Sequence, residues 1–155
     1  MAPGITCALA NVARMRFRLR TATNADVDDL LALWLEAAEN ESRPADTREA
    51  VVALLSRDAD AVIVAEAEHD GPLIGSIIAG WDGWRYHLFR LAVLPSWRRQ
   101  GVGAALLEAA EARFKELGAT RADAMVLTGN DLGQRLWKAR GYHEQPGWRR
   151  WIKPL

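Results

Sequence analysis

The pattern of apolar and polar positions divides the chain into short strands and amphipathic helices. Residues 16–20 alternate arginine with phenylalanine and leucine, which is the period of two expected for a half-buried strand. Apolar runs at 61–68 and 73–81, separated by a short turn, predict an antiparallel pair. Residues 84–94 continue this pair as a third consecutive strand, which Pro95 stops.

Two amphipathic helices are predicted between the first strand and the second. The first helix carries apolar residues at spacings of three and four over 27–38, and either Thr23 or Asn24 can cap it. The second helix begins near Asp46, which forms a capping box with Glu49 three residues later.

The second half of the chain predicts the longest helix, one more buried strand and a short helix. Gly101 opens the long helix and Gly118 is its C-cap. Residues 122–127 are interpreted as a strand, 131–140 as the short helix, and 142–153 as one or two final strands. The order of elements indicates a single α+β sheet with mixed, mostly antiparallel strand directions.

Composition and charge narrow the class of protein. The 155 residues have the length of one domain, 50% are hydrophobic, and the formal net charge is zero. This balance gives no reason to expect nucleic acid or an anionic membrane as a partner. The single cysteine, Cys7, has no intrachain partner and no zinc spacing is present, so we expect a cytoplasmic protein without a metal. We set residues 1–14 apart as a flexible N-terminal extension and assign 15–155 to the domain.

A strand that runs through a glycine-containing turn into the longest helix is the most informative feature. A helix N-terminus presents unpaired N–H groups and about half a positive charge, so it can hold a phosphate. Gly101 and Gly103 let the backbone approach a ligand, and Arg98 and Arg99 add positive charge. Leu106 stands where a dinucleotide fingerprint needs its third glycine, and the P-loop lysine is absent. A tight turn with solvated arginines is the alternative interpretation.

Two motifs connect this loop with a known family. Arg98-x-x-Gly101-x-Gly103, preceded by Leu91-Ala92-Val93-x-Pro95, resembles the acetyl-CoA motif of the GNAT superfamily of acyl-CoA-dependent N-acetyltransferases. Asn130, followed by Leu136-Trp137-Lys138-Ala139-Arg140-Gly141-Tyr142, resembles the family's Asn…Tyr-x-x-x-Gly-Phe segment. The resemblance implies a central sheet splayed between its fourth and fifth strands and flanked by helices, about four in number.

The same resemblance implies where acetyl-CoA would lie. Its pantetheine arm would occupy the splay and pair with the strand that ends at Val93, and its pyrophosphate would rest on the backbone amides of the loop. The cofactor-binding residues implied in this way are Leu91, Ala92, Val93, Arg98, Arg99, Gln100, Gly101, Val102, Gly103, Ala104, Asn130 and Trp137.

Direct transfer to an amine requires a base. A lysine-like amine titrates near ~10.4, so it must lose a proton before it can attack. His87 is the candidate, because histidine titrates near neutrality and an ideal strand would give it the same face as Phe89, Leu91 and Val93. A histidine that only hydrogen-bonds its neighbours at a strand edge is the alternative. Weaker candidates for the base are Asp82 and Glu66.

The developing oxyanion and the departing thiolate also need partners. The resemblance implies that a backbone N–H near Val93 binds the oxyanion. Trp137 stands where the family usually has a tyrosine that protonates the thiolate, and an indole cannot act as an acid near neutral pH. Three alternatives follow: water or Tyr142 is the acid, the thiolate leaves unprotonated, or the domain binds its cofactor without turnover.

The segments that border the acceptor pocket, by resemblance, are rich in tryptophan and acid. A cluster of carboxylates there favours a cationic amine, and a solvated acidic face is the alternative. The tryptophans are Trp34, Trp81 and Trp84, and the carboxylates are those of Glu36, Glu39, Glu41 and Asp46.

The sequence thus indicates an N-acetyltransferase that moves an acetyl group from acetyl-CoA directly to a primary amine of a small molecule or peptide. No serine or cysteine stands beside a base in the motifs, which argues against a covalent step. The alternative is a non-catalytic acyl-CoA-binding sensor or interaction module. We expect acetyl-CoA and an amine acceptor as partners, expect neither nucleic acid nor a membrane, and allow for a homodimer.

Overall fold

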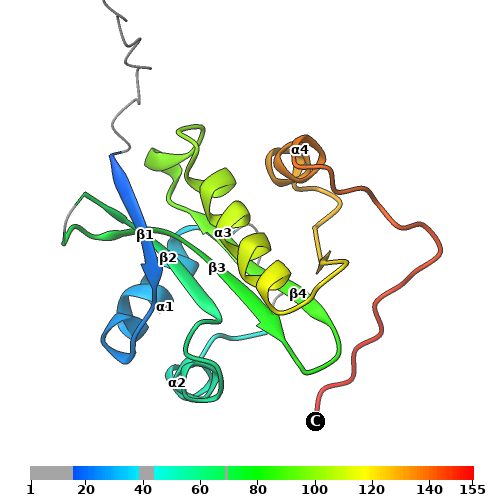
Figure 1. The fold of residues 1–155 in the computed structure, drawn as a ribbon, viewed down its shortest axis with the longest axis horizontal. Helices are drawn as coiled ribbons and strands as arrows, with labels where there is room; N and C mark the ends of the chain where they lie inside the picture. Colours follow the sequence, from blue (N-terminus) through cyan, green and yellow to red (C-terminus); the bar gives the residue numbers. More distant parts are fainter. Residues whose placement is uncertain (1–15, 39–43, 69) are drawn as a thin grey trace, which may run out of the picture.

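The fold is built on one five-stranded sheet in the order β1-β2-β3-β4-β5 (Figure 1). The structure is a computed structural model that describes residues 16–38, 44–68 and 70–155. The first four strands pair antiparallel in sequence order, and β5 pairs parallel with β4. The strands are β1 (Phe17–Thr21), β2 (Val62–Ala67), β3 (Leu73–Trp81), β4 (Tyr86–Val93) and β5 (Asp123–Ala124).

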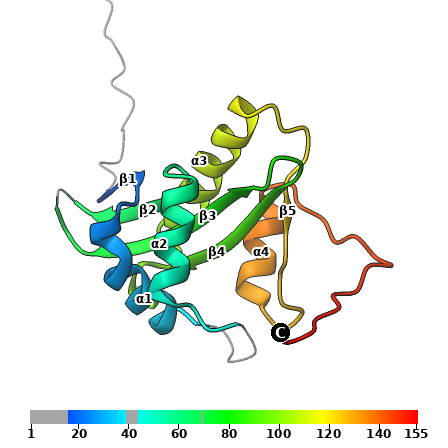
Figure 2. The same ribbon diagram turned by 90° about the horizontal axis from the view of Figure 1, so that it is seen from below.

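Four α-helices flank the sheet in the described chain. Figure 2 shows α1 (Val27–Glu36) and α2 (Arg48–Arg57) on one face, α3 (Val102–Glu116) on the other, and α4 (Asp131–Ala139) near β5. Glycines bound α3 as predicted, because Gly101 precedes it with φ 84° and Gly118 lies just beyond its C-cap with φ 87°. The mixed sheet with helices on both faces confirms the predicted α+β fold.

Each face of the sheet has its own apolar core. The side chains of β2 alternate between the two cores. Ile63 and Ala65 pack in the core under α3, whereas Val62 and Val64 pack in the core under α1 and α2. A strand buried on both faces is a nearly continuous apolar run, as this one is in the sequence. The centre of the sheet is therefore covered by helices on both faces, and β4 is paired with this buried centre along one of its edges.

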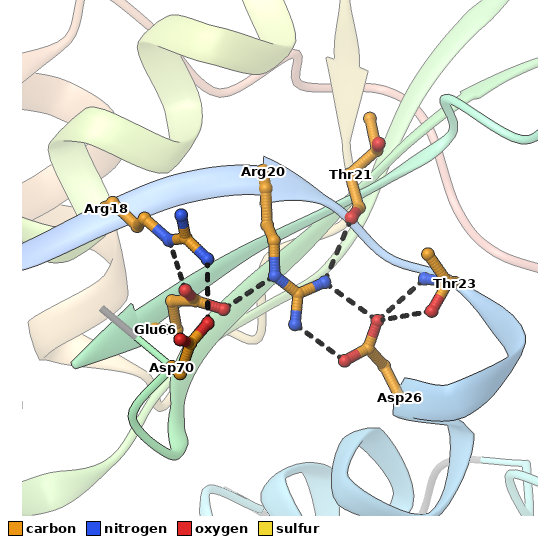
Figure 3. Close-up of polar contacts among 7 residues, drawn as sticks. All are labelled: Arg18, Arg20, Thr21, Thr23, Asp26, Glu66 and Asp70. Atoms are coloured by element: carbon orange, nitrogen blue, oxygen red, sulfur yellow. Dashed lines mark hydrogen bonds and ion pairs between the residues drawn. The ribbon is translucent and has the colours of Figure 1, made fainter. Parts of the chain in front are cut away.

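A buried carboxylate joins β1 to β2 at the edge of the sheet remote from β5 (Figure 3). Glu66 is 2% exposed and accepts hydrogen bonds from Nε of Arg18 and, at 2.6 Å, from Nε of Arg20. Arg20 also holds both oxygens of Asp26, at 2.8 and 2.7 Å. Asp26 accepts from the backbone N–H of Thr23 at 2.7 Å, which fixes the turn before α1. The hydrogen bond from Arg20 is the main cause that lowers the pKa of the Glu66 carboxyl, so this side chain is a structural anion and poorly suited as a base.

Stability should depend on pH through Asp26, whose pKa is lowered to about 2, chiefly by the hydrogen bond from Arg20. An unfolded aspartate titrates near ~3.9, so the contribution of this ion pair is present above that pH and is lost as the pH falls through the folded pKa. Asp26→Asn should lower the free energy of unfolding by about 2 kcal/mol near pH 6 and by about half as much near pH 3, measured by urea denaturation.

The control for this prediction is Asp29→Asn, an exposed carboxylate in the first turn of α1. It should change the free energy of unfolding by less than about 0.5 kcal/mol at either pH. An Asp26→Asn variant that lost the same stability at both pH values would contradict the assigned pKa.

The predicted final strands over 142–153 are wrong. In the described chain no strand follows β5, and residues 143–155 form an exposed segment in which Trp148 and Trp151 are 78% and 92% exposed. The Pro-Gly pair at 146–147 turns the chain soon after α4. Because β5 has only two paired residues, it also has too few backbone N–H and C=O groups in place for a further strand to pair with it.

Two further predictions need smaller corrections. The strand predicted over 122–127 is reduced to its residues 123–124, because the chain leaves β4 after Ala124. The side chain that caps α2 is that of Thr47, whose Oγ1 accepts from the N–H of Ala50 at 3.2 Å, and not that of Asp46. The predicted extension over 1–14, and the rim residues Glu39 and Glu41, lie outside the described residues. Within the part of the chain that the structure describes, no helix has the length and apolar character to cross a bilayer.

Candidate active site

The sheet opens between β4 and β5. These parallel strands pair only at His87 with Asp123 and at Leu88 with Ala124, whereas β4 continues to Val93. Beyond Leu88 no described strand pairs with β4 on this side. The predicted splay between the fourth and fifth strands is thus confirmed, and it leaves backbone N–H and C=O groups of β4 facing an open edge.

A β-bulge at Arg90 changes the face on which the side chains of β4 lie. Ile78 pairs with Phe89 and Ser76 pairs with Ala92, so the strand has one more residue than β3 between these pairs. Arg90 takes a left-handed φ of 50° at this point. The bulge reverses the alternation of side chains along β4. Two side chains that would share a face in an ideal strand therefore point to opposite faces when one precedes the bulge and the other follows it.

His87 therefore does not share a face with all the residues that were predicted to accompany it. Its ring lies beside that of Phe89, with centroids 5.9 Å apart, as expected. Leu91 and Val93, however, pack with Leu88 in the core under α3. The imidazole is half-buried. Because Tyr86 and Leu88, on either side of His87, pack in the core under α3, the alternation of the strand turns the imidazole toward the face that carries α1 and α2.

The other candidates for the base are less well suited than His87. Asp82 is exposed, and its Oδ1 accepts from the backbone N–H groups of Arg85 and Trp84 at 2.7 and 2.8 Å. These two hydrogen bonds are the main reason that the pKa of Asp82 is lowered. Asp123 is a neighbour that sequence reasoning did not single out: it is the partner of His87 in the parallel register and forms an ion pair with Arg121 at 2.6 Å.

The backbone at the end of β4 is oriented by two hydrogen bonds. The N–H of Leu94 donates to the carbonyl of Ile74 in β3 at 2.9 Å. Successive N–H groups of a strand point to opposite sides, so the N–H of Val93 points away from β3 and into the splay. The carbonyl of Val93 has the same direction and accepts from Nε of Arg98 at 3.2 Å.

The loop after β4 ends in an exposed helix N-terminus. A 3₁₀ turn over Pro95–Trp97 leads into the loop, and Nε2 of Gln100 donates to the carbonyl of Ser96 at 2.8 Å. Ala105 N–H donates to the carbonyl of Gly101 at 3.0 Å as the first bond of α3. The N–H groups that precede this bond have no acceptor within the helix and carry its positive end. A helix N-terminus of this kind can hold an anion.

Gly103 brings three elements together at this end of the splay. A Cβ on it would stand 3.1 Å from Cδ2 of Leu136 in α4 and 3.7 Å from Cγ2 of Val93 in β4. By contrast, a Cβ on Gly101 would meet nothing within 4 Å. Gly103 therefore serves close packing, a role that the motif alone does not reveal, whereas Gly101 supplies the left-handed backbone of the loop.

The predicted residues of the α4 region are tied into the fold. Asn130 caps α4 by accepting from the N–H of Gly133 at 2.7 Å. Trp137 is half-buried and meets the ring of Tyr142 edge-on, with centroids 4.9 Å apart. The hydroxyl of Tyr142 donates to Glu111 of α3 at 3.0 Å, and burial together with this bond raises its pKa. Tyr142 is therefore poorly suited to protonate a thiolate.

The predicted acceptor residues are scattered over several environments. Trp34 is 3% exposed and belongs to the core under α1 and α2, so its ring is not a surface platform. Trp84 is 75% exposed but carries the guanidinium of Arg85 4.0 Å from its ring centroid. Trp81 is 41% exposed and stacks on Tyr86, and Glu36 is exposed. No group of His, Cys, Asp and Glu side chains in the described ranges could hold a metal ion.

Comparisons with known proteins agree with this geometry. A family model described as the acetyltransferase (GNAT) family matches residues 25–142. An acetyltransferase of Sodalis glossinidius is 28% identical over 127 residues, which cover 82% of this chain and 87% of that protein.

Solved structures share the fold at lower identity. The PaiA N-acetyltransferase of Thermoplasma acidophilum, solved in complex with coenzyme A, matches with a TM-score of 0.73 and 20% identity over 84% of this chain and 92% of that one. AAC(6')-Iy, solved in complex with the bisubstrate analogue CoA-S-monomethyl-acetylneamine, matches with a TM-score of 0.68 and 21% identity over 90% of this chain and 99% of that one.

Proposed function

Because this chain belongs to the acetyltransferase (GNAT) family, we propose that it transfers an acetyl group from acetyl-CoA directly to a primary amine. The observation that carries the proposal is the splay of β4 from β5 beside the N-terminus of α3. The splay offers a strand edge to an extended, amide-containing arm, and the helix N-terminus at the end of that edge suits a pyrophosphate.

The described residues fit acetyl-CoA in this slot. The amides of the pantetheine arm would pair with β4 from Leu91 to Val93, as an added strand would. The pyrophosphate would accept hydrogen bonds from the N–H groups of residues 99–104, with exposed Arg99 as an additional cation. Arg98 holds the carbonyl of Val93 at 3.2 Å and so orients the loop against the strand. The other predicted contacts, Asn130 and Trp137, come from the cap and the body of α4.

The two groups that would act in the reaction both belong to β4. The N–H of Val93, which points into the splay, would donate to the thioester oxygen as the amine attacks and that oxygen becomes negative. His87 lies six residues before Val93, about 20 Å along an extended strand, so its imidazole would take the proton of the amine through a chain of waters. The carbon–sulfur bond then breaks, and the amide and a thiolate are the products.

The thiolate departs without help from a protein acid. Trp137 cannot supply a proton near neutral pH, and the proton of Tyr142 is held by Glu111. A thiol of ordinary pKa, about 8.5, is a leaving group that water can protonate after departure. This feature also motivates the second candidate function, a non-catalytic acyl-CoA sensor.

An amine panel separates the two candidate functions. The protein is incubated with acetyl-CoA and each amine, free thiol is followed over time, and the products are identified by mass spectrometry. An acetyltransferase releases thiol in step with an N-acetylated amine. Tight binding of acetyl-CoA with thiol release no faster than in the absence of any amine would instead identify a sensor.

The acceptor class that we propose is a cationic amine attracted by the acidic rim. In the described part of that rim Asp46 is paired with Arg90 at 2.6 Å, which leaves exposed Glu36 as the carboxylate available to an acceptor. Glu36→Gln should raise KM for a cationic acceptor by up to about fivefold at low salt, because exposed pairs contribute ~0.2–1 kcal/mol. The effect should shrink as added salt screens the charge, in steady-state assays.

The control for the rim is Glu116→Gln, an exposed carboxylate at the far end of α3. It should leave KM of the acceptor and its salt dependence unchanged. A panel in which only neutral or anionic amines are good acceptors would contradict the cationic class and leave the assignment of the acetyl-CoA slot intact.

A further inference from the structure

Arg90 forms a bridge between the bulge of β4 and the segment that leads into α2. Its Nε and one terminal nitrogen donate to Oδ1 of Asp46 at 2.9 and 2.6 Å. The same guanidinium lies 5.9 Å from the ring centroid of Trp34 in α1. The side chains of Arg90 and Asp46 are 25% and 19% exposed, so the pair is shielded from solvent more than an ordinary surface ion pair.

The backbone of Arg90 is held by a buried relay of hydrogen bonds that begins at Trp34. Nε1 of Trp34 donates to Oγ of Ser76 at 2.8 Å, and that hydroxyl donates to the carbonyl of Arg90 at 3.2 Å. Trp34 is 3% exposed and Ser76 is fully buried. A buried hydroxyl with both partners in place fixes its neighbours more firmly than apolar packing alone.

These contacts maintain a backbone conformation that an arginine does not prefer. A left-handed φ at a residue with a long side chain costs on the order of 1 kcal/mol and persists only where the surroundings hold it. Here two contacts hold the bulge: the Ser76 hydroxyl on the carbonyl and Asp46 on the side chain. The bulge in turn sets the face of His87 and lies three residues before Val93.

We propose that Arg90 is a positioning residue that joins the acceptor rim to the acyl-transfer strand. This inference rests on the proposed function and deepens it. The Arg90–Asp46 pair holds residues 44–47 over the face of β4 that carries His87, so the amine is presented to the imidazole in a fixed place. Because Arg90 binds the carboxylate of Asp46, this carboxylate organises the site and does not bind the charge of the acceptor.

The test begins with Arg90→Asn and Asp46→Asn. Asparagine tolerates a left-handed φ, so Arg90→Asn removes the guanidinium without making the bulge less favourable. Each variant should raise KM of the best acceptor about tenfold, as expected for a lost charge-assisted hydrogen bond in a binding site, with Kd of acetyl-CoA changed less than about twofold. Arg90→Lys retains the charge and should recover part of the loss.

A double-mutant cycle tests whether the two side chains act through each other. If they do, the double variant Arg90→Asn with Asp46→Asn raises KM no more than either single variant. Effects that add would overturn the proposal, and so would an equal loss of acetyl-CoA affinity, which would indicate general damage to the fold.

Asp58→Asn is the matched control. It breaks the Arg113–Asp58 pair, which is also 2.6 Å long and comparably shielded, with side chains 15% and 21% exposed. This pair joins the end of α2 to α3 and lies outside the proposed site. Asp58→Asn should destabilise the protein to a similar extent and leave KM of the acceptor unchanged.

Hydrogen exchange of the full chain tests the bridge without any acceptor. In Arg90→Asn and Asp46→Asn, peptides that cover residues 44–57 should lose protection against exchange. Peptides that cover β1 and β2 should keep their protection in both variants. If no amine is turned over by the unmodified protein, the proposed function fails while this readout still tests the bridge. Unchanged protection of 44–57 in both variants would overturn the bridge itself.

Discussion

Replacing Gly101 with aspartate should weaken acetyl-CoA binding by about 100-fold or more, because the carboxylate would stand at the helix N-terminus proposed to hold the pyrophosphate. A Cβ at this position meets nothing within 4 Å, so the new side chain has room. Aspartate also tolerates the φ of 84° found here better than most residues. Two like charges ~4 Å apart repel by about 4 kcal/mol at an effective dielectric constant of ~20, which exceeds the energy of a 100-fold change.

Gly101→Asn is the matched control, with nearly the same shape and backbone preference but no charge. It should keep the affinity for acetyl-CoA within about tenfold of the unmodified protein, measured by calorimetry. The circular dichroism of both variants should match that of the unmodified chain. If Gly101→Asp and Gly101→Asn had equal affinities for acetyl-CoA, the pyrophosphate would not bind at this loop. Gly103 is less suited to the test, because Leu136 stands 3.1 Å from a Cβ added there.

Replacing His87 with alanine should lower kcat by about 100-fold or more, the usual size of the loss of a general base. Acetyl-CoA would be bound from residues 91–104, so its affinity should change little. The rate of the unmodified protein should rise with pH, because only the deprotonated base can accept the proton of the amine. His87→Ala should lose that pH dependence, because it removes the base.

His143→Ala serves as the control for the pH profile, since that histidine is exposed after α4. It should retain both the rate and its pH dependence. If His87→Ala kept full activity at neutral pH, the role of base would pass to Asp123, its register partner, or to water. Asp123→Asn in the His87→Ala background would then distinguish those two.

The elements that the sequence predicts well are those set by local chemistry. Gly101 and Gly118 were predicted at the ends of α3, and both have the left-handed φ that favours glycine. The apolar runs of β2 and β3 predicted two buried central strands, which the sheet confirms. The splay of β4 from β5 followed from the family resemblance and from no local pattern, because it depends on where two distant segments separate.

What the sequence does not predict depends on contacts between distant residues. The bulge at Arg90 has no glycine to mark it, since Ser76 and Asp46 from other elements hold it in place. Asp46 has the right spacing from Glu49 for a capping box, yet Arg90 binds it and Thr47 takes the cap. In both cases contacts with distant residues outweigh a local preference.

The tryptophans illustrate the same limit. A tryptophan near an expected pocket can line it or can fill the core, and its spacing in the sequence does not distinguish the two. Trp34 fills the core because Ser76 accepts its indole N–H, whereas Trp148 and Trp151 are exposed because no strand forms around them. The sequence likewise offers Tyr142 as a candidate acid, but its hydroxyl donates to Glu111 in the folded protein.

A single-turnover experiment with acetyl-CoA labelled in its acetyl carbonyl tests the proposed direct transfer most directly. The protein in excess is mixed with labelled acetyl-CoA and the best amine of the panel, and the reaction is quenched at intervals. The masses of the intact protein and of the small molecules are then measured. Direct transfer predicts that the label passes to the amine nitrogen in step with free thiol, while the protein mass stays unchanged. Label found on the protein before the amine, or thiol released without a labelled amide, would contradict it.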